Sequence, residues 1–371
     1  MKQFLSRLVP VFLFLCVACT EADIVSPGPG GGEAEEGVPF RVKNLGMWME
    51  VESRSVVTGG PGEADRNPNP LTEVGVCVTK ESGSGTVSLY NSSVRSQQFV
   101  WNAGAGTGTP LWKPAEGEES LLLYTEKGTV YGYAPAEKSI SLTGTPKAPL
   151  MSGIKVLDKQ KFYFNDGGNQ VDAATDVQWE TDQEDYLYCT AAAQVDRWHP
   201  EVSLEMQHAL SKVSFRVLEE GSAFAGCNVE KVVFKSNGEL KKCTSAKLNL
   251  ATGEVEGTMT AVDQLVFTAG GDTRAVGGES GETTTNVPVQ AFGLVIPVSG
   301  VNVTLELTFD DGRTFTMKPS GAGEGPGTFT ADWKKGYNYI YNLRMQPQGI
   351  ELAEVKVAAW NDGGAYDVPM E

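Results

Sequence analysis

The feature that most constrains this chain is an alternation of apolar and polar residues with a period of two. In "VNVTLELTF", residues 301–309, every second side chain is apolar. A β-strand points successive side chains to opposite faces, so this pattern predicts a strand with one buried face. Asp310 to Gly312 have the composition of a turn, and Phe315 and Met317 continue the apolar face beyond it. We therefore expect a β-hairpin over residues 301–319.

The same period recurs along most of the chain. A second hairpin is expected in "LNLATGEVEG", with its turn at Thr252-Gly253. Further strands are expected in these stretches: "EVGVCVTK", "QQFVWN", "SLLLYTEKGTVYGYAP" and "GYNYIYNLRM". No long stretch has the helical period, and the 43 glycines and 19 prolines suit a protein rich in turns. The pattern predicts an all-β protein built of antiparallel β-sandwiches.

The first residues predict export. Lys2 and Arg7 precede an apolar run, residues 8–18, which is too short to span a bilayer but suits a signal peptide. The run ends at Cys19, and the segment resembles a bacterial lipoprotein signal, although Cys16 stands where a leucine is usual. Cleavage before Cys19 would leave a lipidated cysteine first. The alternative is an ordinary secretory peptide that is cut nearby.

The rest of the chain is long enough for two domains. Residues 19–37 are rich in Gly, Pro and Glu and predict a flexible tether. A polar bridge around Pro200 suggests a boundary, which gives domains over residues 38–197 and 198–371.

The net charge and the lack of catalytic motifs exclude several classes of function. The net charge of −17 repels nucleic acid and anionic lipid. The chain has two histidines, His199 and His208, and neither a GxSxG nor an HExxH motif, so we expect neither an enzyme nor a metal or cofactor site. The acidic stretches at residues 165–176 and 309–313 leave calcium open, although Asp and Gly are more often ordinary turn residues.

Two other residue types leave alternatives open. Four cysteines remain after the leader, and they could form disulfides or act as small buried apolar residues: Cys77, Cys189, Cys227 and Cys243. Six tryptophans lie beside expected strands and could pack in the core or line a sugar platform: Trp101, Trp112, Trp179, Trp198, Trp333 and Trp360.

His208 lies in an apolar stretch where the alternation changes parity. Every second side chain points one way, namely Val202, Leu204, Met206, His208 and Leu210. After Ser211-Lys212 the apolar positions shift by one. Such a shift within one strand indicates a β-bulge or a local bend. We expect His208 to be a half-buried structural residue that hydrogen-bonds backbone freed there. "GIELAEVKVAAW" changes parity in the same way.

Several ordered motifs resemble the fimbrillin superfamily, the pilin-like lipoproteins of Bacteroidetes type V pili. An aromatic strand ends in Tyr131-Gly-Tyr133-Ala-Pro135, "DQEDYLYC" follows, and "VSLEMQHALSKVSFRV" carries His208 and Lys212. "FGLVIPVS", "FTADWKKGYNYIYNLRM" and a last strand ending at Trp360 complete the order. These motifs extend over most of residues 38–364.

The resemblance implies two transthyretin-like β-sandwich domains and a route of assembly. A lipoprotein precursor reaches the surface, a protease cuts after an arginine, and the first strand leaves. A strand from another subunit then fills the groove. Arg54 follows the first strand pattern and is the preferred site, whereas Arg41 lies within it. The alternative is an anchor or accessory subunit that is not cut and keeps its lipid.

The expected function is therefore that of a non-enzymatic fimbrial subunit or fimbrillin-like adhesin at the outer membrane. Its expected partners are other fimbrial subunits, the membrane through its lipid, and a surface receptor of the host or of another bacterium. The alternative is a glycan-binding surface lipoprotein of a polysaccharide-uptake system.

Overall fold

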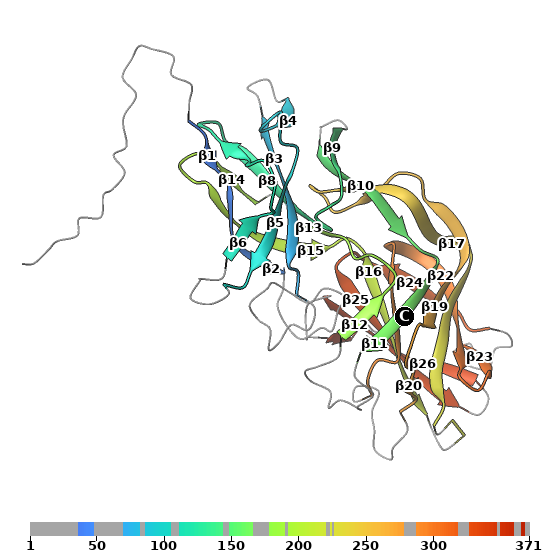
Figure 1. Ribbon diagram of the computed structural model, residues 1–371. Coiled ribbons are helices and arrows are strands. Elements are labelled where there is room, and N and C mark those ends of the chain that lie inside the picture. The colour runs from blue at the N-terminus through green and yellow to red at the C-terminus, as the bar shows by residue number, and fades with distance from the viewer. Residues whose placement is uncertain are drawn as a thin grey trace, which may run out of the picture. The chain divides into compact units, whose positions relative to one another are not determined.

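The computed structural model is all-β across the residues it describes. These are residues 36–47, 70–81, 86–104, 111–143, 148–165, 178–189, 192–219, 223–224, 226–277, 287–317, 326–346, 349–359 and 365–367. Contacts divide the chain into the units Met1–Glu36 and Gly37–Glu371, and the strands belong to the second. Figure 1 shows arrows and no coiled ribbon. Within the described residues there is no helix that could cross a membrane.

Most strands of a nine-stranded sheet come from the first half of the chain. Its main path, in spatial order, is β2 (Arg41–Met47), β15 (Glu201–His208), β13 (Leu187–Cys189), β8 (Gly128–Ala134), β3 (Glu73–Glu81), β5 (Gln97–Asn102) and β6 (Leu111–Pro114). Two further strands pair with it: β4 (Val87–Leu89) and β14 (Ala192–Val195). The edge strands β2 and β6 contact each other, so the sheet curls around one core. A separate two-stranded sheet joins β1 (Val38–Pro39) to β7 (Leu122–Leu123).

An eleven-stranded sheet is built around the 22-residue β17 (Asn228–Asn249). Its path is β12 (Gln178–Thr181), β11 (Lys159–Asn165), β19 (Thr260–Ala269), β17, β10 (Ala148–Val156) and β9 (Ile140–Thr143). Its remaining strands are β18 (Val255–Glu256), β20 (Arg274–Ala275), β22 (Val298–Phe309), β23 (Thr314–Thr316) and β24 (Phe329–Trp333). The expected hairpins are confirmed: β22 pairs with β23, and β17 pairs with β18 across a turn in which Gly253 has φ 73°.

A five-stranded sheet shares a core with the eleven-stranded one. Its order is β21 (Ala291–Val295), β16 (Ser211–Glu219), β25 (Tyr337–Gln346), β26 (Gly349–Ala359) and β27 (Ala365–Asp367). Phe215 and Tyr341 from this sheet lie against Phe234 and Phe267 from the other. Aromatic pairs of this kind bury much apolar area at one place.

The change of parity after His208 marks a passage between sheets. The bend expected there is confirmed at Ala209 and Leu210, but the strand is not continuous, because β15 belongs to the nine-stranded sheet and β16 to the five-stranded one. Near the C-terminus the same change of parity has a different cause, a β-bulge. The register of β25 with β26 skips Ala353, so that strand contains a β-bulge.

Sheet membership does not change at residue 197. β15 lies beyond that point and pairs with β2 and β13, while β10 and β11 lie before it and pair with β17 and β19. The division into domains 38–197 and 198–371 stays a prediction.

Candidate strand-exchange site and buried polar junction

The edge strand β2 pairs with β15 and packs its apolar face into the core. Val42, Leu45 and Met47 are 5–8% exposed and lie in parallel register with Val202, Leu204 and Met206 of β15, in that order. This row of apolar contacts stabilises the pairing of β2 with β15. On its other side, β2 has no backbone pairing with a further strand of the described sheet. Burial of each β2 side chain contributes about 1.5–3 kcal/mol.

The chain entering β2 is fixed by a few contacts. The backbone N–H of Phe40 donates to the carbonyl of Leu121, and that of Arg41 donates to the carbonyl of Pro200. The Phe40 ring meets the Phe99 ring edge to face, with centroids 5.7 Å apart. The other side of β2 borders a hollow that is lined in part by Trp112 and the half-exposed Leu111. If β2 left, β15 would become an edge with an apolar slot beside it.

The outer face of the same strand pair is charged. Nη1 of Arg41 lies 3.6 Å from Oε1 of Glu201, its register partner. Ser203 and Glu205 continue the exposed face of β15, opposite Asn44 and Gly46. Arg41, one of the two cleavage sites expected from the sequence, is therefore the first residue of a strand that is paired with β15.

The two signature residues His208 and Lys212 are buried where the chain passes between sheets. Nδ1 of His208 lies 2.9 Å from Oδ2 of Asp185, and both side chains are at most 2% exposed. The expectation of a half-buried ring is therefore wrong, because the ring is completely buried and its Nδ1 faces a carboxylate. The expected bond from this ring to backbone stays a prediction. Asp185 was missed, although an acid just before the apolar "YLYC" is a visible signal.

Lys212 is completely buried at the start of β16. Its Nζ lies 5.4 Å from the centre of the Phe292 ring. Burial lowers the pKa of Lys212 to about 7, and the negative charge of Asp185 offsets part of that effect. Three ionisable groups, from β15, β16 and the segment before β13, therefore meet at this junction.

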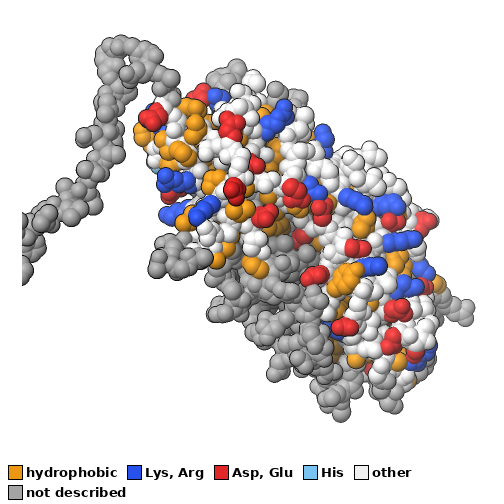
Figure 2. Space-filling view, in the orientation of Figure 1, with side chains coloured by type: hydrophobic (Ala, Val, Ile, Leu, Met, Phe, Trp, Pro, Cys, Tyr) orange, Lys and Arg blue, Asp and Glu red, His pale blue; other side chains and the backbone are white. Residues whose placement is uncertain are grey.

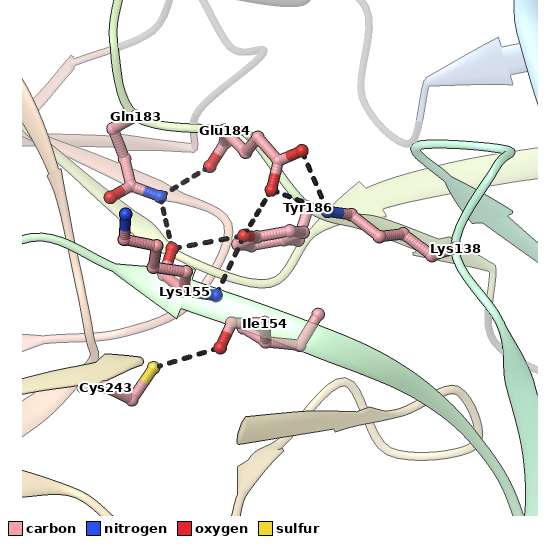
Figure 3. Close-up of polar contacts among 7 residues, drawn as sticks. All are labelled: Lys138, Ile154, Lys155, Gln183, Glu184, Tyr186 and Cys243. Atoms are coloured by element: carbon pink, nitrogen blue, oxygen red, sulfur yellow. Dashed lines mark hydrogen bonds and ion pairs between the residues drawn. The ribbon is translucent and has the colours of Figure 1, made fainter. Parts of the chain in front are cut away.

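Neighbouring side chains satisfy the backbone of an irregular strand (Figure 3). The register of β10 with β17 shifts on both sides of Ile154. Tyr186 Oη accepts from the backbone N–H of Lys155 at 2.9 Å, and lies 3.1 Å from the Lys155 carbonyl and 2.7 Å from Oε2 of Glu184. Tyr186 thus satisfies backbone groups at the irregularity of β10, a contact that the sequence did not predict. Nζ of Lys138 also pairs with Glu184 at 2.8 Å.

Gln183 supports the same bulge from the other side. Its Nε2 donates to the carbonyls of Lys155 and Glu184, each at 2.8 Å, and its Oε1 accepts from the N–H of Leu157. The motif "DQEDYLYC" therefore joins strands of two sheets through polar contacts made by residues 183–186.

Tyr133 of β8 is buried against a glycine. A Cβ atom at Gly75 of β3, its cross-strand neighbour, would lie 2.2 Å from Cζ of the Tyr133 ring. Burial raises the pKa of Tyr133 to about 12, so its hydroxyl stays protonated. The aromatic motif that contains Tyr133 thus corresponds to close packing of β8 against β3.

The remaining predicted residues divide into three groups. Cys19, Arg54, Trp360 and the acids of residues 166–176 lie outside the described residues. All four described cysteines are free and buried, which favours their packing role. Asp310 and Asp311 bond to Asn228 and Arg313, and no cluster able to hold a metal occurs among the residues placed by the structure.

The tryptophans do not form an exposed platform within the described part of the chain. Trp101 and Trp112 have centroids 5.7 Å apart, but their planes are inclined by 58° and Trp112 is buried. Trp333 is also buried, whereas Trp198 is 59% exposed.

Comparisons with known proteins give one family. A family model described as fimbrillin-like matches residues 69–360. A search of curated proteins found no match.

Among solved structures, a candidate cell adhesion protein from Bacteroides uniformis is 14% identical, with a TM-score of 0.49, and the match covers 87% of this chain and 99% of that one. A fimbrial protein from Bacteroides vulgatus is 12% identical, with a TM-score of 0.47 and the same coverage. The tip fimbrial protein Mfa3 from Porphyromonas gingivalis is 10% identical, with a TM-score of 0.34 and again the same coverage.

Proposed function

Because this chain belongs to the fimbrillin-like family, and is therefore not an enzyme, we propose that it is a surface fimbrial subunit or adhesin that assembles by β-strand exchange. The observation that carries the proposal is the seating of β2. It is an edge strand that pairs with β15 alone in the described sheet and buries a row of apolar side chains. Arg54 lies in the sequence between β2 and β3.

Strand exchange would follow from a cut after Arg54. The cut frees β1 and β2 from the rest of the chain, so only non-covalent contacts hold them. An incoming strand can then make the same backbone hydrogen bonds to β15 and fill the same apolar positions. Arg41 is a poorer site because its backbone N–H is bonded to Pro200, and a protease needs an extended, accessible segment.

The route to the surface is part of the proposal. Residues 1–18 act as a lipoprotein signal, Cys19 carries the lipid, and residues 19–37 act as a tether. Two transthyretin-like sandwiches follow, over residues 38–197 and 198–371. Acylation anchors the precursor in the outer membrane because each buried CH₂ group contributes about 0.8 kcal/mol. Other fimbrial subunits and a surface receptor are the partners.

The proposal can be tested with a chain that can be cut at will. Residues 52–57 are replaced by the recognition site of a sequence-specific protease, so that a single cut leaves every strand in place. A fluorescent peptide of residues 38–47 is added, and its binding is followed by anisotropy. The proposal predicts that the peptide enters the cut chain and not the uncut one. Absence of binding to the cut chain would contradict strand exchange.

A further inference from the structure

The exposed face of β15 is acidic where β2 lies beside it. Glu201 and Glu205 are two of the three exposed residues on this strand, and Ser203 lies between them. We refer to these three residues as the acidic rim. The apolar residues that alternate with them face the core. The side chains of the acidic rim therefore lie beside the outward-facing side chains of whichever strand pairs with β15 in the groove.

The resident strand complements only part of the acidic rim. Arg41 pairs with Glu201 at 3.6 Å, and the exposed Lys43 lies at the register shift between Val202 and Ser203, but the register partner of Glu205 is Gly46, which has no side chain. A Cβ atom built at Gly46 would meet nothing within 4 Å, and Gly46 does not have a positive φ. The backbone and the space there would both accept a long side chain.

We propose that the acidic rim selects the strand that fills the groove. The preferred partner is an extended strand of another subunit with apolar residues at the positions of Val42, Leu45 and Met47 and basic residues at the positions of Arg41 and Gly46. This inference rests on the proposed strand exchange and specifies the chemistry of the donor. The apolar positions supply most of the affinity, while the rim discriminates between donors.

The charge of the whole chain acts in the same direction. A net charge of −17 attracts a basic strand and repels an acidic one before contact. Charges at the edge of an interface act mainly on the association rate, and salt screens them. Selection by the rim should therefore weaken as the ionic strength rises.

The test uses the cut chain and four labelled peptides. The first has the sequence of residues 38–47, the second carries Arg41→Glu, the third Gly46→Lys and the fourth Gly46→Glu. We expect the lysine peptide to bind several-fold more tightly than the unchanged one, and the two acidic peptides to bind on the order of tenfold more weakly than the lysine peptide. These differences should shrink in 1 M salt.

A charge-reversed chain identifies the rim as the cause. The variant Glu201→Lys/Glu205→Lys should prefer the Gly46→Glu peptide to the Gly46→Lys peptide. The control Glu230→Lys/Glu239→Lys changes the net charge equally at two exposed residues of β17, and it should keep the original order.

The outcomes separate this inference from the function on which it rests. If no peptide enters the cut chain, strand exchange fails and the inference fails with it. If all four peptides bind equally, or the β17 control reverses the order as fully as the rim variant, exchange stands and selection by the rim is wrong.

Discussion

At the scale of single residues, the junction between sheets is defined by ionisable side chains where an apolar core would be expected. Lys212 and His208 are buried on successive strands, and Asp185 lies beside both. A buried charge is costly unless it is paired. The arrangement links β15, β16 and the segment before β13, because displacing one of them would disturb the contact of His208 with Asp185 or the electrostatic effect of Asp185 on Lys212.

Replacing Lys212 by methionine should change how stability depends on pH. The pKa of Lys212 is about 7 in the folded chain and 10.5 ordinarily, so between these values the unfolded chain binds the extra proton. The free energy of unfolding of the wild type therefore gains up to about 1.4 kcal/mol per pH unit, relative to Lys212→Met, as the pH rises from 7 to 10. Denaturant titrations at several pH values measure this. A constant difference between the two proteins would contradict buried titration.

The two histidines provide a matched pair of variants. His208→Ala removes a buried ring and leaves the buried carboxylate of Asp185 without its contact to Nδ1, so it should lower the free energy of unfolding by about 3 kcal/mol. His199→Ala removes a ring that is 78% exposed and bonded to Asp196, and should cost less than about 1 kcal/mol. Urea unfolding of both variants checks the difference. Similar losses of unfolding free energy in the two variants would show that the contact of His208 with Asp185 does not stabilise the fold more than an exposed contact does.

At the scale of elements, irregular strands are stabilised by side chains that replace missing ladder bonds. The bulge in β10 receives Tyr186 and Gln183, which reach it from the segment before β13. Burial raises the pKa of Tyr186 well above its ordinary value, so the hydroxyl keeps the proton that it donates.

Removing the Tyr186 hydroxyl should therefore weaken the fold. Tyr186→Phe leaves the Lys155 backbone groups without this partner in a partly buried place, at a cost of about 1–3 kcal/mol. Tyr163→Phe, at a half-buried ring of β11, is the comparison and should change stability by less than about 1 kcal/mol. Thermal unfolding followed by circular dichroism measures both. Equal losses would contradict a role for the hydroxyl in the bulge.

Local elements could be predicted from the sequence because their signals are local. Alternation and turn residues identified β22, β23 and β25, and the strands β3 and β5 appear where their motifs lie. Pairing between distant segments leaves no such trace. The parallel register of β11 with β19 and the contact of His208 with Asp185 depend on which chain segments meet, and one parity shift can mark either a bulge or a passage between sheets.

At the scale of the whole molecule, β1 and β2 are the part of the fold that we propose to be exchanged. The face shown in Figure 2 carries acidic and basic side chains interspersed, so no single patch on that face accounts for the net charge of −17. In the proposed assembly, the apolar slot beside β15 would receive the incoming strand, and the acidic rim would favour a basic one. The tether and lipid would hold the precursor at the surface until the cut.

The most direct test of strand release is to measure the intact mass and the N-terminal residue of the protein taken from its native cell surface. Strand release predicts a chain that begins at Ser55 and carries no lipid, because β1 and β2 would have left after a cut at Arg54. A lipidated chain that begins at Cys19 and still contains residues 38–47 would contradict strand release. A start at Val42 would also contradict it, because nearly all of β2 would remain in the groove.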